Sequence, residues 1–120
     1  MIMNITDKII FFNIKNSYEA MRNKDRSNPL FRANLYECTR KYWSVADEKA
    51  STATHILGCY YGKVIEVIRI QEFHVEHTGK LAGRKVFEGI EQPDSIYMGM
   101  DLHEIFNSLA NFRVKYYNLP

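Results

Sequence analysis

The sequence predicts an α+β domain with a mostly antiparallel, curved sheet or small open barrel and two main helices. Three observations favour this class. Strand-like segments outnumber helical ones, most of them follow one another directly, and one of them carries apolar residues on both faces. A chain of 120 residues is expected to form one domain, over residues 1–120.

The central element is a predicted β-hairpin over residues 54–73, whose two strands join at Gly62. β-branched residues are dense just after this glycine, at Val64, Ile65, Val67, Ile68 and Ile70. The segment Tyr60-Tyr61-Gly62-Lys63 supplies the turn signal. Because the second strand has apolar residues on both faces, each face of the sheet needs a covering layer.

The segment before the hairpin is predicted to hold one strand and then helices. The strand spans Lys8–Lys15, and a short helical piece begins at Ser17. Asn28-Pro29 is a helix-start signal, with Asn as the cap and Pro at the first helical position. The helix that follows carries an apolar stripe at Phe31, Leu35, Cys38 and Tyr42. A capping-box spacing at Ser44–Asp47 predicts another short helix that ends near Ala53.

Two strands and a helix are predicted after the hairpin. Arg84–Gln92 is expected to be a strand, with Gly89 as a bulge. Asp101 and Glu104 resemble a capping box, and they precede an amphipathic pattern at Leu102, Ile105, Phe106 and Leu109. Alternation over Phe112–Tyr117 predicts the last strand.

Composition excludes several classes of protein. Apolar residues make up 46% and charged residues 25%, a globular balance that excludes disorder. The net charge of +2 is too small for non-specific duplex binding by charge alone, although it is compatible with a local basic patch. No apolar run approaches the roughly 20 residues of a membrane span. With no signal peptide, Cys38 and Cys59 are expected to be reduced thiols in a cytoplasmic protein.

The strongest candidate binding surface lies beside the apolar stripe of the helix after Pro29. It combines cations and aromatic rings at Arg32, Tyr36, Thr39, Arg40 and Trp43. Arginine pairs with phosphate, and the flat face of an indole stacks on a base. In the alternative interpretation, Trp43 is an anchor of the core.

Glu66 is the second candidate, because it lies among β-branched residues where an unpaired carboxylate is costly to bury. Either it pairs with Arg40 and orients a ligand or acts as a base, or it lies near an edge and is solvated. The four histidines are scattered, and no cysteine or carboxylate cluster completes a metal site. We therefore expect neither a metal nor a cofactor.

Several motifs resemble a known family. They are Asn13-Ile-Lys-Asn-Ser17-Tyr18, the block Leu35-Tyr36-Glu37-x-Thr39-Arg40-x-x-Trp43, Tyr60-x-Gly62-x-Val64-x-Glu66, Phe87-x-Gly89 and Tyr97-x-Gly99. In this order they resemble the domain beside the nuclease in some bacterial GIY-YIG endonucleases of the LEM-domain-associated type. The Val64–Val67 strand is similar to the PUA-like group, which includes ASCH and EVE domains. That resemblance implies a PUA-like fold and binding of RNA, modified bases or nucleosides.

The chain departs from the family pattern in two segments. Gly99-Met100-Asp101 stands where the family has Gly-Lys-Ser, and Ala110-Asn111-Phe112 stands where it has Gln-Asn-Pro. The loss of the Lys and the Ser removes two groups that suit phosphate.

Our first hypothesis is a non-catalytic domain that binds a nucleotide or a nucleic-acid base. Trp43 and Tyr36 would stack on the base, Arg40 and Arg113 would meet phosphate, and Glu66 would hold Arg40 or accept from the base edge. The candidate ligand-binding residues are Tyr36, Thr39, Arg40, Trp43, Tyr60, Glu66, Asn111 and Arg113.

Two alternatives stay open at this point. One is a small hydrolase resembling the ASCH group, acting on a nucleoside, in which Thr39, Lys41 and Glu66 serve catalysis. The other is an interaction or inhibitor module from a phage or defence system, with a protein partner or as a homodimer. An aromatic-rich surface serves both a nucleotide and a protein, so the sequence does not separate this module from the first hypothesis.

Overall fold

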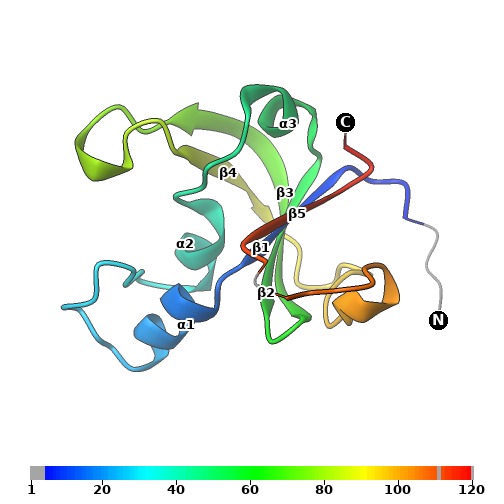
Figure 1. Ribbon diagram of the computed structural model, residues 1–120, viewed down its shortest axis with the longest axis horizontal. Helices are drawn as coiled ribbons and strands as arrows, with labels where there is room; N and C mark the ends of the chain where they lie inside the picture. The colour runs from blue at the N-terminus through cyan, green and yellow to red at the C-terminus, as the bar shows by residue number, and fades with distance from the viewer. Residues whose placement is uncertain (1–4, 111, 120) are drawn as a thin grey trace.

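The computed structural model describes residues 5–110 and 112–119, and its framework is a five-stranded sheet in the order β4-β3-β2-β1-β5 (Figure 1). The strands are β1 (Ile9–Asn13), β2 (His55–Tyr60), β3 (Lys63–Val75), β4 (Lys85–Glu91) and β5 (Val114–Tyr117). β1 runs parallel to β2, and the other neighbours pair antiparallel. The predicted α+β class with a mostly antiparallel, open sheet is therefore confirmed.

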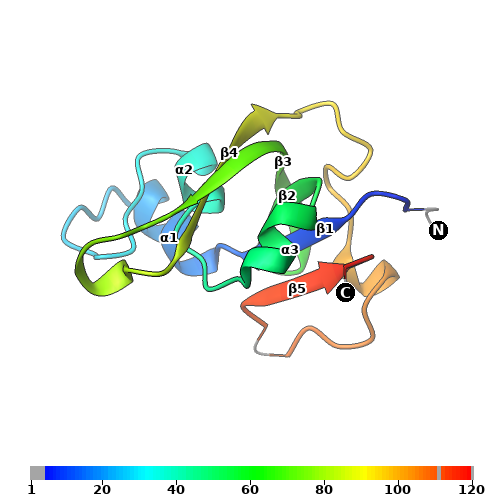
Figure 2. The ribbon, with the colours of Figure 1, turned by 90° about the horizontal axis from the view of Figure 1, so that it is seen from above.

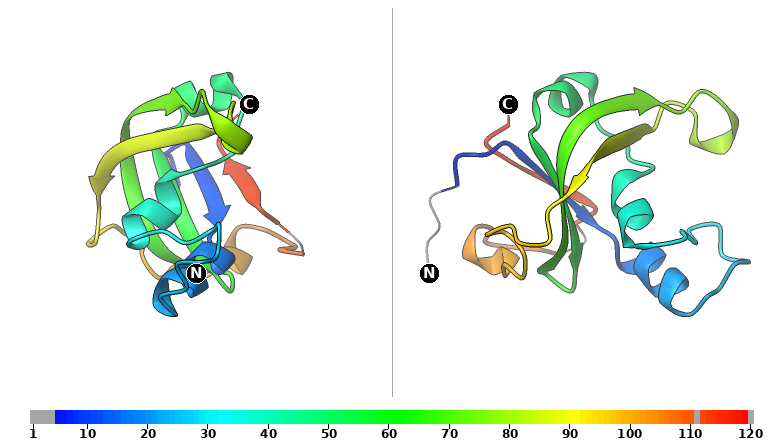
Figure 3. Two further views of the ribbon diagram at one scale, coloured as in Figure 1. Left: turned by 90° about the vertical axis from the view of Figure 1, so that its left-hand side faces the viewer. Right: turned by 180° about the vertical axis from the view of Figure 1, so that it is seen from behind.

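Three short helices, rather than two main ones, accompany the sheet: α1 (Lys15–Arg22), α2 (Leu35–Arg40) and α3 (Asp47–Thr52). α3 contacts β3, and Figure 2 shows the molecule from above with α3 toward the viewer. α2 contacts β2, β3 and β4. Figure 3 shows β3 and β4 curving together past this helix. The strands bend because β3 contains two register shifts, which increase local twist.

The predicted helix start at Asn28-Pro29 is wrong. Asn28 instead forms a turn, in which its Oδ1 accepts from the amide of Leu30 at 2.9 Å. α2 begins at Leu35, six residues after Pro29, and the side chain of Asn34 caps it by accepting from the Glu37 amide. Asn side chains serve both turns and helix caps, so the first asparagine and proline mimic a helix start.

The predicted amphipathic helix after Asp101 is also shorter than expected. The chain forms only a single 3-10 turn, Leu102–Glu104, which Asp101 caps through the amide of His103. Leu102 is fully buried, and Ile105, Phe106 and Leu109 pack against the same core. The apolar residues reach the core from a turn and a loop, because an isolated helix this short is marginal.

The predicted hairpin is present, and its turn residues have the required geometry. Tyr61 and Gly62 have φ values of 49° and 76°. Two central residues with positive φ form the type I′ turn whose twist matches that of the strands.

A bulge in β3 changes which face of the sheet its later side chains occupy, so they no longer follow simple alternation. Val64 pairs with Cys59 and Glu66 pairs with Gly58, so Ile65 is the extra residue. Val64 and Val67 consequently share one core, although they are an odd number of positions apart. At the second shift, the extra residue is Gln71 on β3, and Gly89 on β4 lies beside it. A Cβ at Gly89 would lie 2.1 Å from the Arg69 carbonyl oxygen, so only glycine allows β4 to lie this close to the bulge in β3.

Two apolar cores cover the two faces of the sheet. Ile9 and Phe11 of β1 enter the core that contains residues 97–102, whereas Ile10 and Phe12 enter the core that contains Cys38 and Trp43. Cys38 and Cys59 are both free and buried, one in each core. Within the described residues, no helix is long and apolar enough to cross a bilayer.

Candidate functional site

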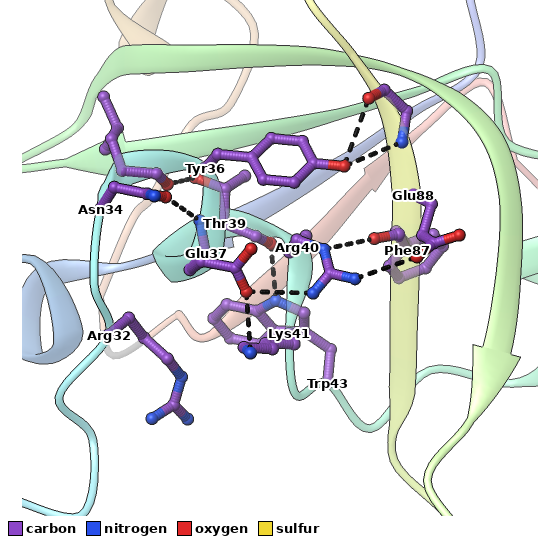
Figure 4. A network of polar contacts seen from close by, with 12 residues as sticks. Arg32, Asn34, Tyr36, Glu37, Thr39, Arg40, Lys41, Trp43, Phe87 and Glu88 are labelled. Carbon is purple, nitrogen blue, oxygen red and sulfur yellow. Dashed lines mark hydrogen bonds and ion pairs between the residues drawn. The ribbon is translucent and has the colours of Figure 1, made fainter.

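Three residues that the sequence singled out, two through their side chains and one through its backbone, fasten α2 and the segment after it to the edge strand β4. The Tyr36 hydroxyl donates to the Gly89 carbonyl and accepts from the Gly89 amide, both at 3.2 Å. Arg40 Nε donates to the Phe87 carbonyl at 3.0 Å. The backbones of Trp43 and Lys85 exchange two hydrogen bonds, at 3.0 and 2.7 Å. Figure 4 shows Tyr36 and Arg40 directed toward the strand, whereas Arg32 extends away from it.

These contacts, here called the β4 clamp, reach three alternate residues of the strand. Every second residue of an edge strand directs its amide and carbonyl outward, where they need partners. The clamp supplies those partners at Lys85, Phe87 and Gly89. Tyr36, Arg40 and Trp43 thus hold the fold together at this edge.

The charge of Arg40 is satisfied inside the protein. Its guanidinium pairs with Glu37 at 3.0 Å and Glu88 at 3.3 Å, and its side chain is only 12% exposed. The expected pair between Arg40 and Glu66 is therefore wrong. Lys41 also pairs with Glu37, at 2.7 Å.

Trp43 occupies the core, as the alternative interpretation predicted. It is 8% exposed, and its ring stacks on Phe12 with centroids 4.1 Å apart and planes 3° apart. Its Nε1 donates to the Thr39 carbonyl at 2.8 Å. The Thr39 hydroxyl donates to Leu35 and sits against Gly58, where a Cβ would lie 2.5 Å from Oγ1. Both residues therefore have packing roles.

Glu66 is buried, so the solvated interpretation of this residue is wrong. It is 3% exposed, and Oε1 accepts from the Val67 amide at 3.0 Å. Oε2 has no hydrogen-bond partner within the described part of the chain. Burial, together with the nearby Glu91 carboxylate, raises the pKa of Glu66 to about 8. Glu66 is therefore mostly a neutral acid at pH 7.

The remaining predicted site residues lie apart from one another. Tyr60 donates its hydroxyl to Glu19 at 2.8 Å and packs edge-on against Tyr18 and Tyr61. Arg113 is exposed at the entrance to β5. Asn111 lies outside the described residues.

A cavity of about 470 Å³ brings together residues that are far apart in the sequence. Its walls come from the start of α1, the loop before α2, residues 41–43, the entrance to β4 and the entrance to β5. It is here called the basic cavity, because five of its lining residues are cationic: Lys15, Arg32, Lys41, Arg84 and Arg113. None of the described lining residues is Asp or Glu. Of the predicted site residues, Trp43 and Arg113 line it.

Carboxylates outside the cavity neutralise two of these cations. Lys15 pairs with Glu19 at 3.2 Å, and Lys41 pairs with Glu37. Arg32, Arg84 and Arg113 have no carboxylate within ion-pair distance among the described residues. The cavity therefore carries a local excess of positive charge.

Arg32 is held in place by neutral groups. Its Nη1 donates to the carbonyls of Pro29 and Phe31 at 3.2 and 2.8 Å, and its guanidinium lies 5.2 Å from the centre of the Tyr42 ring. Its Nε is buried and has no acceptor among the described residues. The cation is oriented before any ligand arrives, and no carboxylate of the described residues lies within ion-pair distance of it.

The start of α1 contributes backbone donors to the same wall. The Lys15 amide donates to the side chain of Asn13, and the first hydrogen bond from an amide within the helix belongs to Tyr18. Asn16 and Ser17 line the cavity between these positions, where helix geometry leaves amides without an intrahelical acceptor. The first turn has no acidic residue. Such a helix end favours anions.

Only two of the five cations in the basic cavity were predicted from the sequence to contact a ligand. Arg32 belonged to the predicted stripe, and Arg113 was a predicted phosphate contact. Lys15, Lys41 and Arg84 were not among the candidate ligand-binding residues, because only the strand order brings residues 15 and 113 to the same wall.

No protein-family model, curated protein or solved structure matches the chain. The resemblance to the GIY-YIG-associated and PUA-like domains therefore stays a prediction.

Proposed function

We propose that this protein is a non-catalytic domain that binds a nucleotide or a nucleic-acid strand through phosphate in the basic cavity. The main support is that five cations, and no described carboxylate, line one cavity of about 470 Å³. This volume lies within the usual range for small-molecule sites. Arginine and helix-start amides are the groups that proteins use most effectively to hold phosphate.

Aromatic rings in the same cavity support a nucleotide rather than a simple anion. Tyr42 and Phe112 line it and are only partly buried. Arg32 and Lys41 flank the Tyr42 ring, at 5.2 and 5.5 Å from its centre. Cations beside aromatic faces are typical of sites where bases stack next to a phosphate backbone. Tyr42 and Phe112 replace Tyr36 and Trp43 as the stacking residues of the proposal.

The proposal also agrees with the modest net charge of +2. Five cations from separate segments line the one cavity, and none of its described lining residues is a carboxylate. Local charge, rather than net charge, determines whether phosphate is attracted to a concave site.

The hydrolase alternative receives less support. Its three residues have separate partners: Thr39 donates to Leu35, Lys41 pairs with Glu37, and Glu66 accepts from Val67. We therefore propose binding without catalysis.

A thermal-shift screen with the double variant Arg84→Ala/Arg113→Ala tests the proposal. The panel contains mononucleotides and short single strands of RNA and DNA. A ligand at about 100 times its Kd stabilises a protein by roughly 2.7 kcal/mol, a shift of several degrees in Tm. We expect at least one panel member to give such a shift with the unmodified protein. The shift should fall strongly in the double variant, whose own Tm should be unchanged because the described contacts of these two residues are made by the backbone.

Arg69→Ala is the matched control. This arginine is exposed on β3 and does not line the basic cavity. The control should keep the full ligand-dependent shift. An equal shift in all three proteins would place the ligand elsewhere, and a flat screen with folded proteins would refute nucleotide binding in favour of a protein partner.

A further inference from the structure

The cavity holds more unpaired positive charge than one internal phosphodiester can match. Three arginines, Arg32, Arg84 and Arg113, have no carboxylate within ion-pair distance in the described part of the chain. The start of α1 adds roughly half a positive charge, with no acidic side chain in its first turn to offset it. A phosphodiester brings only one negative charge. A terminal phosphate brings about 1.5 to 2 at pH 7 and three acceptor oxygens.

The three arginines and the start of α1 also surround one cavity from different sides. α1 and Arg113 approach from the chain near β1 and β5, whereas Arg32 and Arg84 come from the loop before α2 and the entrance to β4. A terminal phosphate has three oxygens free to meet donors from several directions. A diester has only two such oxygens, because its other two carry the chain.

From this charge and arrangement, we infer that the basic cavity selects a terminal phosphate, either a monoester or a short polyphosphate, over an internal phosphodiester. The inference rests on the proposed function and specifies the ligand of the same site. A free nucleotide and the 5′-phosphorylated end of a strand present this chemistry equally.

A phosphate monoester takes up a proton as the pH falls through its second pKa, which is about 6. No histidine is among the described lining residues. Hydrogen bonds from Tyr60 and Lys15 keep the pKa of Glu19 below its usual value. Lys41 and Arg40 do the same for Glu37, against the effect of burial. A loss of affinity near pH 6 would therefore report protonation of the ligand.

Calorimetric titration with matched adenine ligands tests the inference. The ligands are adenosine, 5′-AMP, ADP and 3′,5′-cyclic AMP, whose phosphate is a diester. We expect AMP and ADP to bind at least about tenfold more tightly than cyclic AMP, as extra charge-assisted hydrogen bonds would give. This preference should shrink below pH 6. It should also shrink in Arg84→Ala/Arg113→Ala but not in Arg69→Ala.

A pair of tetranucleotides, with and without a 5′-phosphate, separates the two sources of the terminal group. Preference for the phosphorylated strand over AMP would assign the site to strand ends, and the reverse order would assign it to free nucleotides. Equal affinity for AMP and cyclic AMP, lost in the double variant, would overturn this inference and leave the proposed function standing. Absence of binding by every ligand would overturn both.

Discussion

At the scale of single residues, Glu66 shows how neighbours determine the state of a group. A carboxyl group that is 3% exposed, lies beside the Glu91 carboxylate and has the Val67 amide as its only donor among the described residues is disfavoured as an anion. The sequence identified Glu66 as costly to bury, and its interpretations were an ion pair with Arg40, a base, and solvation near an edge. The pair is wrong because α2 directs Arg40 to Phe87 and Glu88 of β4, and solvation is wrong because Glu66 is buried.

The raised pKa of Glu66 predicts a pH-dependent stability. The folded-state pKa is about 8, against a usual value of 4.5. A raised pKa means that the folded state holds a proton that the unfolded state has released. Its contribution to stability is therefore complete below about pH 4.5 and is lost as the pH rises to about 8. We expect the free energy of unfolding to fall across this window, by an amount on the order of a few kcal/mol.

Glu66→Gln should flatten this dependence, because a glutamine is neutral at every pH and nearly the same size. Urea unfolding at a series of pH values between 4.5 and 8.5 measures the effect in both proteins. Identical slopes for the two proteins would show that Glu66 is not the group responsible.

At the scale of elements, the β4 clamp explains why the most distinctive block of the sequence is structural. Tyr36, Arg40 and Trp43 contact successive outward-facing positions of one edge strand. Edge strands left open promote aggregation, and a covering helix with polar side chains prevents it. A pattern of cations and aromatics on a short helix is compatible with a ligand site or a clamp, and only the position of β4 distinguishes them.

Arg40→Ala should therefore lower stability and leave ligand binding unchanged. The variant removes the donor to Phe87 and leaves Glu37 and Glu88 with one fewer cation. Hydrogen bonds to charged groups contribute about 1.5–3 kcal/mol, so we expect a loss in that range from denaturant unfolding. Arg22→Ala, at an exposed position of α1, is the matched control and should change stability by less than about 0.5 kcal/mol. A variant with unchanged stability and lost ligand binding would restore Arg40 to the site.

Local signals predicted the elements better than their exact limits. The hairpin was predictable because Tyr61-Gly62 and the β-branched run act within a few residues of each other. The bulge at Ile65 was not, because it depends on the partner strand. The local rule for a helix cap fits both Asn28, which forms a turn, and Asn34, which caps α2, so it does not choose between them. Packing against β2, β3 and β4 favours the second.

At the scale of the whole molecule, the strand order creates the candidate site. Placing β1 between β2 and β5 brings the start of α1, which follows β1, close to the segment that enters β5. The Asn13 amide donates to the Arg113 carbonyl at 3.0 Å, which joins these two segments beside the basic cavity. Sequence spacing cannot show this arrangement, since residues 15, 32, 84 and 113 belong to four separate segments. Arg113 was predicted only as a single cation.

The most direct test of the phosphate-binding account is a map of amide chemical shifts by NMR while ADP is added to the ¹⁵N-labelled protein. We expect the largest changes on amides around the basic cavity, such as Asn16, Ser17 and Arg84, and no change at Gly89 in the β4 clamp. Changes centred on Gly89 and the exposed face of α2, or no changes at all at millimolar ADP, would contradict it.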